Sequence, residues 1–442
     1  MTAQDAPASD AGPPTSGDPA EPTWRFVRRA AATLAVGAML AFSSSFGQTF
    51  FLSLFGGVWR EAFNLSHGAF GAVYAAATLA SAASLLWLGK IVDQAPPSQI
   101  ATTLLVLTAL ASVWLSSAAS AFALGIGLFA MRVLGQGLLS HLAMTMMAKW
   151  FDAARGRALG VAMLGFPIGE AVLPILATSV AAAYGWRTAW IGVAGLVVIL
   201  LAPAIFLLAR QAEAVIPMSD LHQQNGGSGD ENSRARPSWR RHDALRDWRF
   251  YALAPGLLAT PFIITSVLFH QAHLVDVKRW TLTAFSALFP LYAIASITAG
   301  LVCGRIVDAV GTRRVLPYFL LPLSFGLLFL SLTDNFVVAA LFMAMMGATA
   351  GAATIVYTSI WSELYGTGHL GAIRAAAVSA MVLSSAVGPA LIGVALDAGV
   401  GLDAQLRAMC AAAAAAAVSL ALLEDSLRWR PPPLHSLTDD IL

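Results

Sequence analysis

Residues 304–314 read GRIVDAVGTRR, and this stretch decides how the rest of the chain is organised. Residues 89–93 read GKIVD and match its beginning at an offset of 215 positions, without a gap. At the same offset Pro174 falls on Pro389. Self-similarity at one fixed offset indicates repeated structural units. The sequence therefore predicts two related halves.

The composition places both halves in a membrane. Hydrophobic residues make up 58% of the 442 positions and charged residues only 11%. A soluble domain carries about 25% charge because its surface is wet, so most of this exterior must face lipid. The net charge of +2 gives no support for nucleic-acid binding. The two cysteines, Cys303 and Cys410, lie in apolar runs without neighbouring ligands, so neither a disulfide framework nor a metal site is expected.

Twelve apolar windows are long enough to cross the bilayer, since a helix needs about twenty residues for about 30 Å of hydrocarbon. They lie near 31–55, 69–92, 100–121, 122–148, 157–182, 188–209, 250–272, 284–304, 315–332, 336–362, 372–396 and 402–424. The predicted fold class is an all-α membrane protein, with 12 transmembrane helices in two pseudo-symmetric six-helix bundles.

The positions of the basic residues give the orientation. With the N-terminus inside, 20 of the 26 Lys and Arg residues fall on the cytoplasmic side and five outside, while Arg132 alone lies mid-span. This bias is typical of cytoplasmic loops, so both termini are expected in the cytoplasm. The predicted divisions are a disordered cytoplasmic tail (1–24), an N-terminal bundle (25–209), a cytoplasmic linker (210–249), a C-terminal bundle (250–425) and a second cytoplasmic tail (426–442).

The repeated loop carries a family resemblance. Residues 304–314 fit the pattern G-x-x-x-D-x-x-G-x-(R/K)-(R/K) at Gly304, Asp308, Gly311, Arg313 and Arg314, and the chain therefore resembles the major facilitator superfamily. We expect Gly304 to allow close helix approach, Asp308 to face a helix N-terminus, and the arginines to hold the loop inside.

The resemblance is incomplete in the first half. There Gly89 and Asp93 match the loop pattern, but no basic pair follows them. Glu363, at the inner end of the tenth span, is expected to latch to Arg313 or Arg314 rather than bind cargo.

A second signature lies between the fourth and fifth spans. Residues 150–169 resemble the pattern F-x-x-x-R-x-x-A-x-G-x-A-x-x-G-x-x-x-G of monocarboxylate and oxalate–formate type members. Its Gly165 and Gly169 predict close packing between helices. The resemblance implies an organic-anion substrate. However, those relatives carry a cation in helix eight or eleven, whereas here 285–303 has no charge and Arg374 lies only at the cytoplasmic mouth.

Two charges fall near mid-membrane, where a charge indicates function by default. Arg132 lies about 15 Å into the fourth span and Glu170 about 20 Å into the fifth, at 1.5 Å per residue. Arg132 also resembles the helix-four arginine of the superfamily. Our hypothesis is that the two side chains pair and that substrate or a proton competes for one of them. The alternative is a fixed ion pair that braces two helices.

Other polar side chains are weaker candidates for substrate contact. Gln48 and Ser45 lie in the first span, where a serine more often bonds its own backbone. Tyr292 and Tyr357 lie mid-span, with helix packing as the alternative. His270 and His273, beside Asp276, are interpreted as a solvated outer rim rather than a metal site, because the spacing lacks a third ligand.

Secondary transport agrees best with the span count, the charge bias and the repeat. The sequence has no H-E-x-x-H, G-x-S-x-G or phosphate-binding loop, so neither an intramembrane enzyme nor an ATP-driven pump is expected. A channel or a transport-inactive sensor has less support. We expect a small organic solute moved with proton coupling or exchange, no cofactor, a monomer, and a bacterial-type inner membrane. The alternative is a proton-coupled exporter of drug-like or metabolite molecules.

Overall fold

A computed structural model describes residues 22–151, 154–215 and 238–431. The described residues form helices and connecting turns, with no strand among them. Most of both predicted tails, at 1–21 and 432–442, and residues 216–237 of the predicted linker lie outside this part. The described residues up to 215 are called the first half below, and those from 238 the second half.

The first half contains six membrane-length segments, several of them interrupted by short 3₁₀ or π-helical turns. Its elements are α1 (Thr23–Arg29), α2 (Ala31–Ser44), η1 (Ser45–Gly47), α3 (Thr49–Leu52), η2 (Ser53–Phe55), α4 (Gly56–Ala62), α5 (His67–Leu88), η3 (Gly89–Asp93), α6 (Pro97–Ser117), α7 (Ala121–Met131), η4 (Arg132–Leu139), α8 (Ser140–Trp150), α9 (Arg155–Ala162), α10 (Gly165–Tyr184), α11 (Trp186–Gly195), η5 (Leu196–Leu201) and α12 (Ala202–Val215).

The second half repeats this plan with fewer breaks. Its elements are α14 (Arg241–Ala244), α15 (Trp248–Ala252), α16 (Ala254–Phe269), α17 (Gln271–Val277), α18 (Leu282–Ser286), α19 (Phe289–Val310), α20 (Thr312–Val315), α21 (Leu321–Leu332), α22 (Phe336–Tyr365), α23 (Leu370–Asp397), α24 (Leu402–Leu423) and η7 (Glu424–Leu427).

Each predicted span has a helical counterpart. Ten helices among the described residues are long and apolar enough to cross a membrane, and a bent pair, Ala31–Gly47 with Thr49–Ala62, makes an eleventh. The twelfth counterpart is Leu321–Leu332, an apolar helix that is shorter than a full crossing. The all-helical membrane fold is therefore confirmed.

The first span departs from the continuous helix expected over 31–55. It bends by 47° between its two parts, because Gln48 is extended, with φ −78° and ψ 153°. The break coincides with a close approach of two backbones. A Cβ built on Gly135 of η4 would lie 2.7 Å from the Cα of Gly47, so neither position has space for a side chain.

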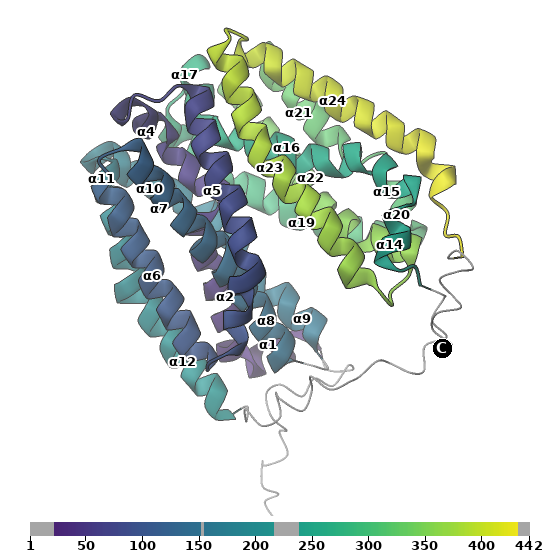
Figure 1. The fold of residues 1–442 in the computed structure, drawn as a ribbon, viewed down its shortest axis with the longest axis horizontal. Coiled ribbons are helices and arrows are strands. Elements are labelled where there is room, and N and C mark those ends of the chain that lie inside the picture. Colours follow the sequence, from purple (N-terminus) through teal and green to yellow (C-terminus); the bar gives the residue numbers. More distant parts are fainter. Residues whose placement is uncertain (1–21, 152–153, 216–237, 432–442) are drawn as a thin grey trace, which may run out of the picture.

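The two halves meet at one end of the molecule. Figure 1 shows the first half, purple to blue, and the second half, green to yellow, meeting along α5 and α23 and diverging toward α8, α9, α14 and α20. Following the orientation predicted from the basic residues, we call the end that holds α4 and α17 the outer end. Small residues bring α5 and α23 together there: a Cβ on Gly71 would lie 2.7 Å from the Cα of Ala390, and one on Gly393 would lie 2.5 Å from the His67 carbonyl.

Glycines also bring helices together within each half. A Cβ on Gly165 would overlap the Ala38 carbonyl, and one on Gly169 would overlap the Ser45 hydroxyl, so α10 packs directly on α2. This is the close packing predicted from the spacing of Gly165 and Gly169. In the second half, Gly351 has the same relation to the Ser296 carbonyl, between α22 and α19.

Candidate functional site

Arg132 is the buried cation of the first half, with a side chain that is only 4% exposed. It begins η4 and faces the break in the first span. Its Nη1 donates to the Thr49 hydroxyl at 3.3 Å and to the Gly47 carbonyl at 3.5 Å. The guanidinium lies 5.1 Å from the ring centroid of Tyr74, and the Tyr74 and Thr49 hydroxyls are hydrogen-bonded to each other. The bend therefore supplies oxygen acceptors to Arg132.

Glu170 lies on α10, one residue after the glycine that packs on α2, and its side chain is half-buried. The helix turns it toward the second half, where α10 packs on α19. The Tyr292 hydroxyl of α19 lies within electrostatic range of the Glu170 carboxylate. Pro174, four residues later in the same helix, leaves the Glu170 backbone carbonyl without its usual helical donor. Glu170 is thus a carboxylate at the boundary between the halves.

The predicted ion pair between Arg132 and Glu170 is not formed in this structure. No ion pair joins them within the part of the chain described, and each side chain faces different neighbours. Arg132 is directed to the bend in the first span, whereas Glu170 is directed to α19. The hypothesis of a direct pair used only depth along each helix. It could not specify the direction of each side chain around the helix axis.

Of the two first-span candidates, Ser45 has a packing role in this structure. Ser45 is fully buried against Gly169, and its hydroxyl has no hydrogen-bond partner among the described residues. Its neighbours Ser43 and Ser44 donate to the carbonyls of Met39 and Ala41, each at 2.7 Å. Gln48, at the bend, is half-buried.

The two tyrosine candidates differ in their surroundings. Tyr292 is buried, 7% exposed, and faces the boundary with Glu170. Tyr357 donates its hydroxyl to the Leu257 carbonyl at 2.8 Å. Leu257 stands four residues before Pro261, which cannot supply the usual helical donor. Tyr357 therefore completes the hydrogen bonding of α16, which favours packing over substrate contact.

The loop motif at 304–314 forms a latch in a way that differs from the prediction. The Glu363 carboxylate accepts from the Thr312 backbone N–H and hydroxyl, both at 2.6 Å, and from the Arg313 N–H at 3.4 Å. It thus caps the start of α20 rather than binding the guanidinium of Arg313 or Arg314. Gly311 permits this turn because its φ is +86°, a region that favours glycine.

Two other parts of the motif were predicted wrongly. Gly304 makes no close approach, since a Cβ there would meet nothing within 4 Å. Asp308 is exposed and accepts no hydrogen bond from a described residue. The helix-capping role that was expected of Asp308 is taken by Glu363. The motif pattern located the loop correctly, but it could not show which carboxylate would cap the helix.

The first half has an equivalent that the sequence did not reveal. Glu213, on α12, accepts from the Ser98 backbone N–H at 2.7 Å and from its hydroxyl at 2.8 Å, at the start of α6. Gly89 begins η3 and lies near His141, while the side chain of Asp93 lies outside the described residues. A carboxylate cap thus stands in both halves at the end opposite the outer end.

The outer seam, formed where α5 meets α23 and the bent first span meets α17, was not predicted. Asp397 of α23 accepts from the Ser66 hydroxyl at 2.6 Å and from the N–H groups of Gly68 and His67 at 2.8 and 3.0 Å, capping α5 across the two halves. Gln271 of α17 donates to the Phe50 carbonyl at 3.0 Å. Ser66 before an apolar run was the only signal in the sequence, and it marks a helix start without naming its partner.

The sequence suggested a solvated rim at His270 and His273, and this is wrong for His270, whereas His273 is half-buried and lines a cavity of about 480 Å³. His270 is 4% exposed and contacts the Pro389 carbonyl at 2.9 Å. His67, from the first half, brings its ring to 4.5 Å from that of His273 and 5.8 Å from that of His270. Among the described residues no group of His, Cys, Asp or Glu side chains has the arrangement of a metal site.

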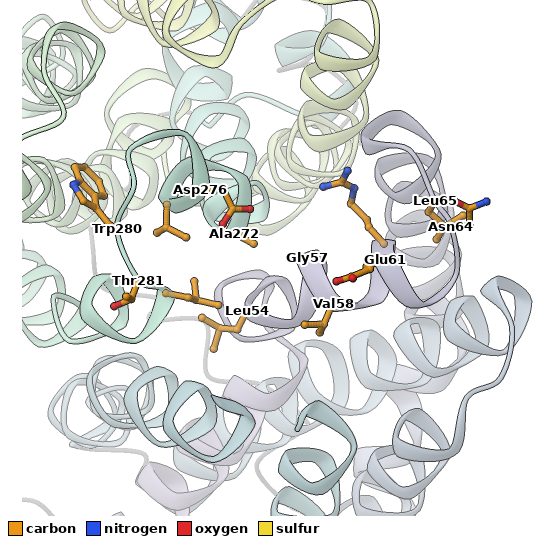
Figure 2. Close-up of a pocket in the computed structure, with 13 residues that line it drawn as sticks. Leu54, Gly57, Val58, Glu61, Asn64, Leu65, Ala272, Asp276, Trp280 and Thr281 are labelled. Atoms are coloured by element: carbon orange, nitrogen blue, oxygen red, sulfur yellow. The ribbon is translucent and has the colours of Figure 1, made fainter. Parts of the chain in front are cut away.

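A cavity of about 670 Å³ opens beside this seam. Figure 2 shows Leu54, Gly57 and Glu61 of the first half facing Ala272 and Asp276 of the second. Arg60 also lines the cavity. Burial lowers the pKa of the neighbouring His273, and the positive charge of Arg60 lowers it further, whereas the charge of Asp276 raises it. The outer end is therefore closed by polar contacts that solvent can reach.

Comparison with known proteins identifies the architecture. The family model described as Major Facilitator Superfamily matches residues 37–389 and 252–440. A bacterial homologue of the human lysosomal transporter Spinster, in inward-facing occupied and unoccupied forms, is similar at 13% and 15% identity. Each comparison covers 93% of this chain and 100% of the other, with a TM-score of 0.56.

The nucleoside transporter NupG is similar at 11% identity and a TM-score of 0.67, covering 89% of this chain and 98% of the other. At these identities the likeness shows the fold alone. A comparison with curated protein sequences found no significant match.

Proposed function

Because the chain belongs to the major facilitator superfamily, we propose that it carries a small organic anion, such as a monocarboxylate, by alternating access with proton coupling or exchange. It is a multi-pass membrane transporter and not an enzyme. The proposed substrate class and the proposed coupling to protons rest on the two charged side chains described above, Arg132 and Glu170.

The observation that carries the proposal is the uncompensated guanidinium of Arg132. It is buried, it donates only to neutral oxygen atoms, and its Nε has no hydrogen-bond partner among the described residues. Burying a cation without an anion is costly. A carboxylate from the substrate would supply that anion, and the planar fork of Arg suits it. Tyr74 and Thr49 hold the guanidinium at the bend in the first span.

Glu170 is the second charge in the proposed mechanism. It lies on the helix that faces the second half, and Tyr292 faces it from α19. A charged carboxylate between the halves opposes close packing that excludes water, because burial favours the neutral form of a carboxyl group. Protonation of Glu170 removes this charge and permits the halves to rock around the substrate. In this mechanism Arg132 binds the anion and Glu170 binds the proton, and the two side chains do not bond to each other.

A proton-coupled exporter of drug-like or metabolite molecules is the second candidate. It is favoured by the second half, where the membrane-spanning middle of α19 carries no cation and Arg374 lies near the start of α23. A cargo without a carboxylate would then bind on aromatic surface, such as that of Tyr292, with Glu170 alone exchanging protons.

The setting we propose is a bacterial-type cytoplasmic membrane, with both termini in the cytoplasm and a monomer as the working unit. The Arg-rich turn at α20 and the carboxylate caps of both halves then lie on the cytoplasmic side, as the bias of positive charge favours.

Counterflow in proteoliposomes with a panel of monocarboxylates, with and without a pH gradient, tests the proposal. We expect exchange of at least one anion. Arg132→Gln should lower it at least tenfold, because a charged hydrogen-bonded pair contributes about 1.5–3 kcal/mol. Arg132→Lys, which keeps the charge but not the planar fork, should retain part of the activity.

Glu170→Gln separates coupling from binding. The variant should still exchange the anion but should no longer accumulate it in response to a pH gradient. Unchanged pH dependence in Glu170→Gln would remove the coupling role. Efflux of a lipophilic cation, with no exchange of any anion in the panel, would replace the proposal by the exporter.

A further inference from the structure

The outer seam holds a group of basic side chains contributed by both halves. Arg60 and His67 come from α4 and α5 of the first half, and His270 and His273 come from the α16–α17 corner of the second. The rings of His67 and His273 are 4.5 Å apart, and Arg60 acts electrostatically on both of them. These four residues are called the outer basic cluster below.

The proposed transport mechanism uses Arg132 and Glu170, which are distant from this cluster in the sequence. It does not use the cluster. Its position nevertheless matters for the conformation, because the seam closes around it. Asp397 caps α5 beside His67, and Gln271, next to His270, bonds the Phe50 carbonyl and the Ser53 hydroxyl. Any force that separates His67 from His273 acts directly on these contacts.

Solvent has access to the cluster from two sides. The cavity of about 670 Å³ is lined by Arg60 and Asp276. A second cavity, of about 480 Å³, is lined by His67 and His273. Protons from the outer solution can therefore reach the imidazoles while the seam is closed.

We propose that the outer basic cluster is a proton-binding site for the outer solution, and that protonation of His67 and His273 opens the outer seam. Each imidazolium would stand beside another imidazole and beside the permanent charge of Arg60. Like charges at this distance repel, and the repulsion acts between the two halves. Opening separates the charges and exposes them to water. The inference holds whichever cargo the transporter carries.

The negative groups around the cluster do not cancel this effect. Asp276 and Asp397 face it from α17 and α23, and Asp403 and Arg407 line the second cavity with the histidines. Asp397 is already engaged by three donors of the α5 start, and Asp403 is paired with Lys278 at 2.9 Å. Asp397 and Asp276 both act electrostatically on Arg60, and at His273 burial and the charge of Arg60 outweigh Asp276.

The direction of the pH dependence follows from the burial of the cluster. Closing the seam lowers the pKa of His273 through burial, with Arg60 adding to the effect. The open form therefore binds protons more readily than the closed form. Acidification through the ordinary histidine value of about 6.5 shifts the equilibrium toward the open form, by about tenfold for each unit by which the two forms differ in pKa.

The distance between the halves at the outer end is the direct measurement. Tyr184 and Val337 are 73% and 72% exposed and lie at the outer ends of α10 and α22. Spin labels on Tyr184→Cys and Val337→Cys, in a chain with Cys303→Ala and Cys410→Ala, report this distance by pulsed electron spin resonance. We expect a population with a longer distance to grow at least tenfold between pH 7.5 and pH 5.

Matched variants assign the effect to the cluster. His67→Gln with His273→Gln should abolish the growth of the long-distance population, and Arg60→Gln should reduce it. His369→Gln, at the cytoplasmic start of α23, should leave it unchanged. Size-exclusion profiles and thermal unfolding at pH 7.5 verify that each variant is folded.

The Glu170→Gln background separates this inference from the proposed transport mechanism. If the cluster is the switch, acid still opens the seam when Glu170 cannot titrate. A response that disappears with Glu170→Gln, or that persists in the His67/His273 variant, would overturn the inference. So would a distance distribution that does not change with pH.

Discussion

Lys278 is a buried ammonium at the outer end of the second half. It lies 2.9 Å from the carboxylates of both Asp334 and Asp403, which come from the start of α22 and from α24. Burial alone would lower its pKa, but the hydrogen bonds to Asp334 and Asp403 outweigh burial, so the pKa is raised. One side chain thus joins three segments of the second half.

The raised pKa of Lys278 predicts how stability depends on alkaline pH. A group whose pKa is higher in the folded state stabilises the fold fully below its unfolded value, about 10.4, and ceases to do so as pH rises through the folded value. The temperature of unfolding in detergent should therefore fall steeply above about pH 10.4. In Lys278→Arg, where the charge persists, this loss should be smaller. Equal losses in both proteins would contradict the assignment.

For single residues, the sequence indicated which charged residues lie near mid-membrane, but not which neighbours their side chains face. Arg132 and Glu170 were both predicted near mid-membrane, and both lie on the expected helices. Their side chains face different neighbours because the break at Gln48 offers oxygens to Arg132, and a break of this kind has no proline or other marker in the sequence. His270 was predicted to be solvated because its burial depends on α23, more than a hundred residues later.

At the scale of elements, a carboxylate from another helix caps the start of one helix in each half, at the end opposite the outer end. Glu363 of α22 caps α20, and Glu213 of α12 caps α6. The repeat at offset 215 predicted related halves, and the two caps are similar in role. However, the two caps come from helices that do not correspond in the two six-helix halves. Aligning the halves therefore does not lead from Glu363 to Glu213.

Replacing each cap tests its contribution. Glu363→Gln and Glu213→Gln each keep the shape but lose the charge that the helix starts favour, which should lower the free energy of unfolding by about 1 kcal/mol. Because the caps are in different halves, the double variant should show the sum. Thermal unfolding in detergent measures this. Glu61→Gln, at an exposed position whose side chain has no hydrogen-bond or ion-pair partner among the described residues, is the control. An equal loss there would remove the special role of the caps.

Across the whole molecule, the halves touch along the outer seam and between α10 and α19, and they diverge at the opposite end (Figure 1). Gly57 and Ala272 face each other across this seam, as Figure 2 shows, and a Cβ on Gly57 would lie 3.3 Å from the Cβ of Ala272. A disulfide needs a Cβ separation of about 3.5–4.5 Å, so a small adjustment would permit one.

A disulfide at this position tests whether the halves must separate. In a chain with Cys303→Ala and Cys410→Ala, the pair Gly57→Cys and Ala272→Cys should cross-link under mild oxidation. Counterflow should then stop and return on reduction. Each single cysteine variant should be unaffected by the oxidant. Full activity in the cross-linked protein would show that the outer seam need not open.

The overall architecture was the part most accessible from the sequence. Apolar windows, basic loops and the repeat each report on where a segment lies relative to the membrane, and membranes restrict these choices strongly. The way that the halves close was not accessible, because the seam depends on pairs such as Asp397 with the start of α5, more than 300 residues apart. Short polar side chains of that kind leave no periodic pattern.

The bend at Gln48 also bears on how the chain is made. The first span leaves the ribosome before the later helices exist, and Ala31–Gly47 alone would extend about 25 Å, short of about 30 Å of hydrocarbon. Insertion therefore requires its continuation through Thr49–Ala62. The Phe50 carbonyl, just after the break, receives its donor from Gln271, more than 200 residues later in the chain. The hydrogen bonding around the bend is therefore completed only after the second half has been made.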